Sequence, residues 1–370
     1  MDEPTCRACG ASSGSVVLDL GLQPACDYFP AQDDPGPDPV YPLQMWLCAS
    51  CGLAQLVADP TVPEEPRATE PAALVAQAQD AVRRVGSAHL LPKGGRVIEF
   101  GSPHGGSWLD LVVSRGMKPA ADGELAEVVL DCFGLMHAAE QSAALRERAD
   151  LVAPGGVLLL QYHSLATIIR LGQWNALRHG HFAYYSTTAL INMLRDVGFG
   201  ASTAWTFDLY SGTVLLAARR TSEGEGEPDA AVMALLQEER GVGVTNPDVL
   251  AGLQNDALRR SEHLHRALVA ERAAGRRVLG YGAASRAVTL LARAGVDRTL
   301  LPAVADASSA KQGQRMPGTD IPIVAPSHLV EDSPDSVMLF LPDLLDEVRT
   351  AWPEVEARGG HWIDADSLES

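Results

Sequence analysis

The sequence lacks long apolar runs. None of its segments reaches about 18 consecutive apolar residues, the shortest run expected of a transmembrane helix. Its first residues, Met1–Pro4, also lack the basic region and following apolar stretch of a secretory signal. These absences predict a cytoplasmic protein that does not span a membrane.

Positive charge is scarce as well. The 29 lysines and arginines are outnumbered by 47 aspartates and glutamates, which gives a formal net charge of −18. Nucleic acid requires a basic surface, so we exclude it as a partner. A phosphorylated small molecule remains compatible, because a pocket can be basic inside an acidic shell. The length of 370 residues and the apolar content of 46% predict a globular protein with two or three domains.

Cysteine is sparse, but its spacing is informative. Four of the six cysteines form two Cys-x-x-Cys-Gly motifs: Cys6, Cys9, Cys48 and Cys51. Two such motifs can supply the four thiolates of a tetrahedral Zn²⁺ site, and four thiolates leave no open position for catalysis. We therefore predict a structural zinc ion, with two disulfides or reduced core thiols as the alternatives. Cys26 and Cys132 are expected to be buried thiols.

Two segments show an apolar strand, a glycine turn and a helical pattern, which is how a nucleotide-binding βα unit begins. The first starts at Arg96–Ser102, and the second at Arg276–Arg286. Further strands are expected at residues 127–131, 157–161, 301–306, 337–341 and 361–364. The predicted fold class is α/β, with two Rossmann-like domains preceded by a small zinc-binding domain.

Helices and linkers separate these units. Apolar spacing predicts helices over Ala72–His89 and Pro247–Ala274. Pro60–Pro71 is rich in proline and glutamate, and Thr221–Pro228 is acidic and rich in glycine, so both are expected to be linkers. The segment His179–Ser186 is polar and aromatic, and we expect a loop there rather than part of a core.

Several motifs together resemble those of the sugar C-methyltransferases, which methylate a ring carbon of keto-deoxysugar nucleotides. Glu99-Phe100-Gly101-Ser102 is similar to the turn that binds S-adenosylmethionine in that family. Asp131–His137 and His179–Ser186 are similar to its N-V-F-A-H strand and its H-E-H-[FYL]-[SA]-Y-[FLY]-S loop. Gly280–Ser285, together with residues 310–313 and 317–322, is similar to its C-terminal domain. The order of the motifs matches too, so the resemblance covers nearly the whole chain.

The resemblance implies five segments. These are a zinc-binding domain (1–60), a linker and helix (61–95), a methyltransferase-like Rossmann domain (96–220), an acidic linker and long helix (221–275), and a C-terminal Rossmann-like domain (276–370). In that family the nucleotide sugar lies between the middle and C-terminal domains. The implied partner is therefore a small molecule, a nucleotide sugar, as in the biosynthesis of natural products.

The resemblance also implies site residues. Methylation beside a ketone requires a base that titrates near neutrality, which favours histidine. His181 is the expected base, with His179 and Tyr184 as further catalytic candidates. Glu99, Gly101 and Ser102 are expected to bind the cofactor S-adenosylmethionine. The expected substrate-binding residues are Tyr185, Gly280, Gly282, Ser285, Arg286, Asp306 and Lys311.

The donor site departs from the family pattern. Lys118 stands where the family has the acidic residue that accepts the ribose hydroxyl groups. The segment between Gly101 and Asp131 is too short for the family's helices, and Pro103-His104 replaces Asn-Asp. In the loop, Gly180 stands where the family has glutamate. These departures argue against S-adenosylmethionine binding in the family's manner.

Several functions therefore remain open. The first is a C-methyltransferase that forms an enolate. The second is a donor-independent descendant that catalyses a proton shift, epimerisation, elimination or rearrangement on a nucleotide-sugar-like or natural-product substrate. The third is a non-catalytic binding partner, and an NAD-dependent oxidoreductase using Gly280–Ser285 is a distant fourth. The sequence identifies neither the sugar and ring position nor the oligomeric state.

Overall fold

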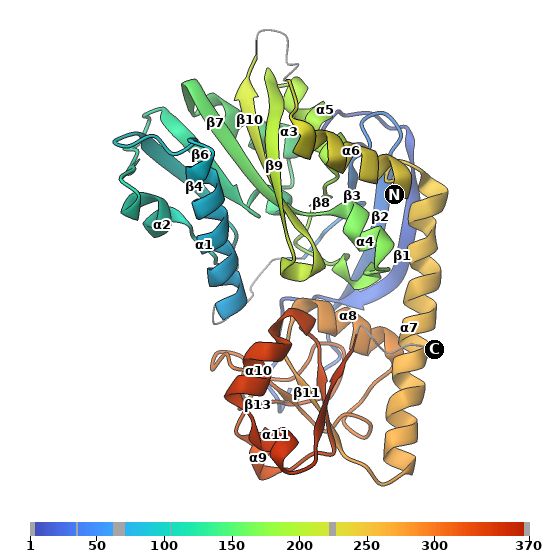
Figure 1. Cartoon of the computed structure of the whole chain (residues 1–370). Helices are drawn as coiled ribbons and strands as arrows, with labels where there is room; N and C mark the ends of the chain where they lie inside the picture. The colour runs from blue at the N-terminus through green and yellow to red at the C-terminus, as the bar shows by residue number, and fades with distance from the viewer. Residues whose placement is uncertain (1–3, 35, 62–70, 104, 222–226, 366–370) are drawn as a thin grey trace.

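A computed structural model describes residues 4–34, 36–61, 71–103, 105–221 and 227–365. Residues 62–70 and 222–226, which fall in the two expected linkers, and His104 lie outside this description. The predicted fold class is confirmed. A small antiparallel sheet adjoins two larger α/β units, and the long helix α7 (Pro247–Ala273) runs along their side (Figure 1). Among the described residues, no helix is both long and apolar enough to span a membrane.

The N-terminal sheet is antiparallel and has the strand order β1-β2-β3-β8. Its strands are β1 (Gly14–Pro24), β2 (Val40–Cys48), β3 (Ala54–Leu56) and β8 (Ala183–Tyr184). The last of these comes from the middle of the chain. The segment 179–186, expected to be a loop outside the core, is therefore mostly buried, and the sequence-based expectation was wrong. Two of its residues complete the sheet that the cysteine motifs begin.

The middle unit is a six-stranded sheet with the order β5-β4-β6-β7-β10-β9, in which β10 runs antiparallel to both neighbours. The strands are β4 (Arg96–Gly101), β5 (Lys118–Pro119), β6 (Ala126–Cys132), β7 (Val152–His163), β9 (Phe199–Phe207) and β10 (Thr213–Arg220). The helices are α1 (Ala72–Ser87), α2 (Leu109–Ser114), α3 (Gln141–Asp150), α4 (Leu165–Arg170), α5 (Thr187–Arg195) and α6 (Ala230–Val242), with short 3₁₀ turns η1 (Leu135–His137), η2 (Trp174–Ala176) and η3 (Leu209–Ser211).

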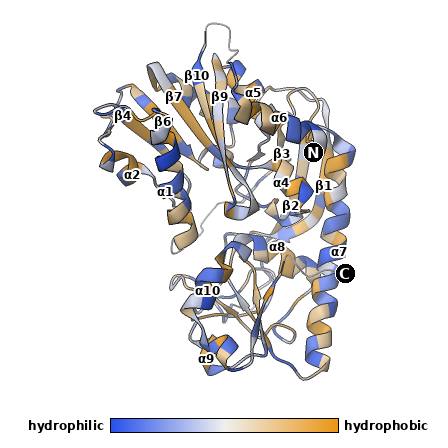
Figure 2. Cartoon of the chain, in the orientation of Figure 1, coloured by the Kyte–Doolittle hydropathy of each residue, from blue (hydrophilic) through white to orange (hydrophobic). Residues whose placement is uncertain are grey.

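Alternation along the middle strands explains why helices cover both faces of this sheet. Val128 and Leu130 face a core completed by α1 and α2. Val129 faces the opposite core, completed by α3, α5 and α6. Because successive side chains of a strand point to opposite faces, a continuously apolar strand requires cover on both sides. Figure 2 shows the apolar colouring concentrated on these central strands.

The C-terminal unit is a parallel five-stranded sheet with the order β13-β12-β11-β14-β15. Its strands are β11 (Val278–Tyr281), β12 (Val304–Ala305), β13 (Ile323–Val324), β14 (Ser336–Leu339) and β15 (His361–Asp364). Its helices are α8 (Ser285–Ala294), α9 (His328–Glu331), α10 (Leu345–Ala351) and α11 (Glu354–Ala357), and η4 (Pro342–Leu344) is a 3₁₀ turn.

Helix α7 joins the units into one structure. Its buried residues include Leu250, Leu253, Leu264 and Leu268 of the predicted apolar pattern, whereas Leu258, also part of that pattern, is exposed. They belong to a single apolar core that also contains residues of β1, β2 and α8. The small N-terminal sheet and the C-terminal unit are therefore packed onto the same helix.

Candidate active site

The two cysteine motifs converge on one point. The four Sγ atoms of Cys6, Cys9, Cys48 and Cys51 lie within 4.8 Å of one another. Cys6 and Cys51 are 3.4 Å apart, and Cys9 and Cys48 are 3.7 Å apart, too far for disulfide bonds. A tetrahedral ion with Zn–S bonds of about 2.3 Å places its sulfurs about 3.8 Å apart. The residues therefore fit zinc, and the disulfide alternative is not observed. Cys26 and Cys132 are buried thiols, as predicted.

The zinc-binding sheet holds the segment that carries His181. Leu56 N–H donates to the Phe182 carbonyl (3.2 Å), and Ala54 pairs with Tyr184 in the ladder between β3 and β8. On the other side of His181, the Gly180 N–H donates to the carboxylate of Asp59, two residues beyond the sheet-forming segment 54–57. Both flanks of His181 are thus fixed by the chain that immediately follows the second cysteine motif.

Gly180 occupies a backbone position that suits glycine. Its φ of +81° lies in the left-handed region, and a Cβ there would stand 3.4 Å from Asp27 Oδ2. The sugar C-methyltransferases that the sequence resembles have a glutamate at this position, and a glutamate would be strained in this conformation. The N-terminal segment supplies the carboxylates of Asp27 and Asp59 beside this position.

His181 lines a cavity of about 300 Å³ between the middle and C-terminal units. Arg178 Nε lies 2.9 Å from His181 Nε2 and donates to it, and the same guanidinium donates to Ser285 Oγ at the start of α8. The ring of His137 packs edge-on against the His181 ring, with centroids 4.6 Å apart. The guanidinium of Arg178 therefore spans the cavity from the middle unit to the C-terminal one.

The sequence reasoning missed His163, which lines the same cavity at the end of β7. Burial, together with the guanidinium groups of Arg286 and Arg178, lowers the pKa of His163 to about 3. This imidazole is therefore neutral at physiological pH. The sequence could have indicated His163 as a functional residue, because it follows a predicted strand and functional groups gather at the carboxyl ends of parallel strands.

The other catalytic candidates have structural contacts. The Tyr184 hydroxyl accepts from the Arg178 N–H (3.0 Å), and burial raises the pKa of Tyr184. The Tyr185 hydroxyl donates to Gln141 Oε1, although both tyrosines line the cavity. His179 lies outside the cavity, buried against the ring of Tyr41. Of the two loop histidines, His181 is therefore the one that faces the cavity.

The C-terminal glycine turn forms the opposite wall. Gly282 (φ +93°) and Ser285 line the cavity, as does Arg286 in the first turn of α8. Gly280 has another role, because a Cβ there would come within 2.8 Å of Phe340 and 2.9 Å of Val304. Close packing of neighbouring strands therefore requires glycine at this position.

Asp306 and Lys311 hold this turn in place through hydrogen bonds to its backbone. Asp306 Oδ2 accepts from the Ala283 N–H (2.7 Å), and its Oδ1 accepts from the Ser308 N–H (2.8 Å). Lys311 Nζ donates to the Ala283 carbonyl (2.9 Å) and lies 4.7 Å from the centre of the Phe29 ring. Both residues also line the cavity, so they shape the turn as well as its surface.

On the expected donor side, the acidic residue is already engaged. Glu99 Oε1 accepts from the Trp108 N–H, and Glu99 Oε2 accepts from Ser107 Oγ, both at 2.5 Å, just before α2. The exposed strand β5 contains Lys118, and the described residues 120–125 connect it to β6 without a helix. Gly101 ends β4, and Ser102 reaches the cavity. The binding of S-adenosylmethionine by Glu99, Gly101 and Ser102 stays a prediction.

Three family models match successive parts of the chain. Residues 6–64 match "Putative zinc binding domain", residues 72–202 match "Methyltransferase domain", and residues 208–365 match "C-methyltransferase C-terminal domain". The chain is thus an enzyme of the methyltransferase type. Its resemblance to C-methyltransferases that carry a zinc-binding domain extends over all three parts.

A curated relative agrees with this assignment. C-methyltransferase NovU of Streptomyces niveus is 26% identical over 411 aligned positions, which cover 97% of this chain and 94% of that protein. The alignment is longer than the 370 residues of the chain, so the relative has segments that this chain lacks. The shortened connection between β5 and β6 is one place where such a segment is expected.

Solved methyltransferase structures are similar over smaller parts. Magnesium protoporphyrin IX methyltransferase from Synechocystis PCC 6803 with bound SAM is 14% identical, covering 40% of this chain and 80% of that chain, with a TM-score of 0.30. An O-methyltransferase family protein from Burkholderia thailandensis is 17% identical, covering 40% and 58%, with a TM-score of 0.29. Scores this low add nothing to the assignment.

Removing zinc should loosen the His181 segment as well as the cysteine motifs. We expect about one Zn per purified chain, and Cys48→Ser should release it. Hydrogen exchange should then accelerate in residues 6–57 and also in residues 179–186, because β8 pairs with β3. The buried thiol variant Cys26→Ser is the control and should keep its metal. A metal-free protein with unchanged protection of both segments would contradict the assignment.

Proposed function

We propose that this chain removes a proton from a carbon beside the carbonyl group of a nucleotide-linked keto-deoxysugar, with His181 as the base. The observation that carries the proposal is the arrangement of His181 and Arg178 in the inter-unit cavity, facing the glycine turn that opens α8. A cavity of about 300 Å³ lies within the size range of small-molecule sites.

The proton transfer requires a base and a group that stabilises the developing charge. When the substrate carbonyl oxygen takes over the Arg178 N–H that His181 Nε2 accepts in this structure, the proton passes from the substrate carbon to that nitrogen, and the electron pair of the C–H bond moves to the carbonyl oxygen to give an enolate. Arg178 is near enough to donate to that oxygen from beside His181, and a fixed cation in a closed cavity stabilises it strongly. Arg178 therefore holds His181 before the substrate binds and then holds the enolate oxygen, which frees Nε2 to act as the base.

The nucleotide part is assigned to the C-terminal unit. The first turn of α8 lines the cavity, and Arg286 adds a guanidinium on the same helix. Such a helix start favours a phosphate group. Asp306 and Lys311 hold the preceding turn in this shape, which supports a rigid diphosphate site.

The fate of the enolate distinguishes two candidate reactions. In the family's reaction, S-adenosylmethionine supplies a methyl group to the enolate carbon. The engaged carboxylate of Glu99 and the replacement of the ribose-binding acid by Lys118 favour a second candidate, in which the carbon takes back a proton without a methyl donor. This outcome would be a proton shift or an epimerisation.

A nucleoside diphosphate should stabilise the protein. At about ten times its dissociation constant, uridine or thymidine diphosphate should raise the melting temperature by about 2 °C. Arg286→Ala should remove most of this rise, because it deletes the side-chain cation at the helix start. Gly282→Val should also remove it, since its Cβ would crowd Leu341 at 3.1 Å. The exposed Arg298→Ala is the control. No shift at millimolar nucleotide would exclude the nucleotide-sugar assignment.

Proton abstraction can be measured without knowing the product. In D₂O, a nucleotide-linked keto-deoxysugar should exchange the hydrogen beside its carbonyl group in the absence of any methyl donor, as followed by NMR. His181→Ala should slow this exchange by about 10²-fold or more, the usual contribution of a positioned base. The surface variant His328→Ala should exchange like the unaltered protein. If no keto sugar exchanges although nucleotide binds, a non-catalytic binding protein is the better description.

Donor binding separates the two reactions. We expect calorimetry with S-adenosylhomocysteine to give no measurable heat, and S-adenosylmethionine to leave the exchange rate and the mass of the sugar unchanged. The physical reason is that the Glu99 carboxylate is already engaged by Trp108 and Ser107 and that Lys118 stands on β5. Lys118→Glu is the matched variant, since it restores the acidic residue alone. Micromolar binding by the unaltered protein, with a product heavier by one methyl group, would establish methyl transfer and refute the donor-independent reaction.

A further inference from the structure

The segment 179–186 carries the proposed base but no carboxylate. Gly180 stands where the sugar C-methyltransferases that the sequence resembles have a glutamate. A cation is instead in direct contact with the base, because the Arg178 guanidinium donates to His181 Nε2 (2.9 Å). A guanidinium so close disfavours the protonated imidazole, which is the form that His181 takes once it has removed a proton. A base in this position therefore requires negative charge from another part of the chain.

The N-terminal part of the chain brings two carboxylates to Gly180. The Gly180 N–H donates to the carboxylate of Asp59. A Cβ at Gly180 would stand 3.4 Å from Asp27 Oδ2, and the Asp27 side chain is buried. Both carboxylates therefore lie beside the residue that precedes His181, next to the place where a glutamate side chain would begin.

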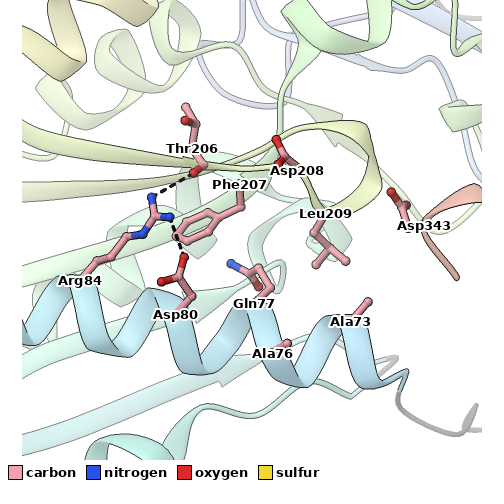
Figure 3. A pocket seen from close by; sticks show the side chains of 10 residues that line it. All are labelled: Ala73, Ala76, Gln77, Asp80, Arg84, Thr206, Phe207, Asp208, Leu209 and Asp343. Carbon is pink, nitrogen blue, oxygen red and sulfur yellow. Dashed lines mark hydrogen bonds and ion pairs between the residues drawn. The ribbon is translucent and has the colours of Figure 1, made fainter. Parts of the chain in front are cut away.

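Within the described residues, the hydrogen-bond donors to the Asp59 carboxylate are all neutral. Besides Gly180, they are the Thr61 N–H (3.0 Å) and the Thr61 hydroxyl (2.6 Å). Asp80 shows the opposite case, since it is paired with Arg84 (2.7 Å) in a second cavity beside α1 (Figure 3). An ion pair cancels much of the field of a carboxylate, whereas neutral donors stabilise the charge and leave its field. Asp59 can therefore act on the groups around it.

The field of Asp59 reaches the segment that carries the base. Burial lowers the pKa of His179, and the charge of Asp59 opposes this change. Burial also raises the pKa of Tyr184, and Asp59 adds to the rise. His179 precedes His181 in the segment and Tyr184 follows it, so the charge of Asp59 acts on both sides of the base along the chain.

The segment that contains Asp27 is anchored to the C-terminal unit. Two residues further along, the Phe29 ring lies 4.7 Å from Lys311 Nζ. The carboxylate of Asp38 then accepts two hydrogen bonds from the Arg315 guanidinium (2.6 and 2.7 Å), and both side chains are buried. Asp27 is thus positioned from one wall of the cavity, independently of the zinc-binding sheet that positions Asp59.

Other charged and titratable groups face His181 from the elements around it. The His137 ring of η1 packs edge-on against it, and Arg7 of the first cysteine motif lies over the Phe182 ring (4.9 Å). Toward the cavity beside α1 lies a neutral pair, in which Gln161 Nε2 donates to Gln77 Oε1 (3.0 Å). The described lining of the His181 cavity adds Arg286, Lys311, Asp306, Asp343, Glu347 and His163. The carboxylates of this lining belong to the C-terminal unit, whereas Asp27 and Asp59 lie at the segment of the base itself.

We propose that Asp27 and Asp59 are positioning residues for His181, whose charges stabilise the imidazolium that forms when it removes the substrate proton. The inference rests on the proposed function, in which His181 is the base. The proton moves from the substrate carbon to His181 Nε2, and both aspartates stay ionised. They thereby supply the negative charge that Gly180 does not. The N-terminal part of the chain then contributes to the chemistry of the cavity as well as to its shape.

Titration of the His181 ring in the full chain tests this role. Protein with isotope-labelled histidine is followed by NMR across neutral pH, and His181→Gln identifies the signal. Asp27→Asn and Asp59→Asn should each lower the pKa of His181 by about 0.5 or more, because the imidazolium loses a nearby opposite charge. The exposed Asp33→Asn changes the net charge equally and should leave this pKa unchanged.

The same variants should slow proton abstraction without weakening substrate binding. With a nucleotide-linked keto-deoxysugar in D₂O, the maximal exchange rate should fall about twofold or more, since a weaker base removes the proton more slowly. The sugar concentration at half-maximal rate should stay the same, because both aspartates act through His181.

A purely structural role predicts the opposite shift. Asp59→Asn leaves one acceptor oxygen for two sets of donors, so loss of structure alone would loosen the segment. A loosened His181 gains water and leaves Arg178, which raises its pKa toward about 6.5. A raised or unchanged pKa in both variants would overturn the inference, even if the unaltered protein exchanges the sugar hydrogen. A lowered pKa with no exchange of any keto sugar would refute the proposed function and leave the effect of the carboxylates on His181 established.

Discussion

The arrangement of the cavity depends on one short strand pairing, between β3 and β8. Strand β3 directly follows the second cysteine motif, and β8 directly follows His181. A two-residue strand has little stability by itself, because few hydrogen bonds offset its loss of conformational entropy. Its position therefore depends on the neighbouring sheet, and that sheet depends on the four thiolates. The metal-binding motifs and the base are thus parts of one structural unit, although more than 120 residues separate Cys51 from His181.

The cavity that His181 lines contains cations inside an acidic protein. Arg178, Arg286 and Lys311 line it together with the carboxylates of Asp306, Asp343 and Glu347, while the whole chain carries a net charge of −18. Burial, together with the same guanidinium groups that would attract a diphosphate, lowers the pKa of His163 and keeps its imidazole neutral. A neutral imidazole can accept a hydrogen bond from a sugar hydroxyl without adding to the positive field. Selectivity for an anionic nucleotide and for neutral ring hydroxyls can therefore be combined in one small volume.

Local patterns predicted much of the fold. Apolar strands ending in glycine located β4 and β11, and the cysteine spacing located the metal cluster, because these features depend on residues close in sequence. The position of His179 and the burial of β8 could not be predicted, since both depend on the N-terminal sheet covering the loop. Gln77 was equally hidden, because a glutamine inside an apolar helical pattern gives no sign of its partner on β7. His163 was accessible to reasoning from its place at a strand end, but only once the extent of β7 was known.

Helix α7 also limits how such proteins can change in length. Its 27 residues span about 40 Å, and it packs on β1 near one end and on α8 further along. One inserted residue between these contacts would turn the following apolar face by about 100° away from the core. Insertions and deletions are therefore expected to be rejected within this helix and tolerated in connections such as that between β5 and β6. The helix therefore fixes the positions of the two walls of the cavity relative to each other, while the rest of the chain can vary in length.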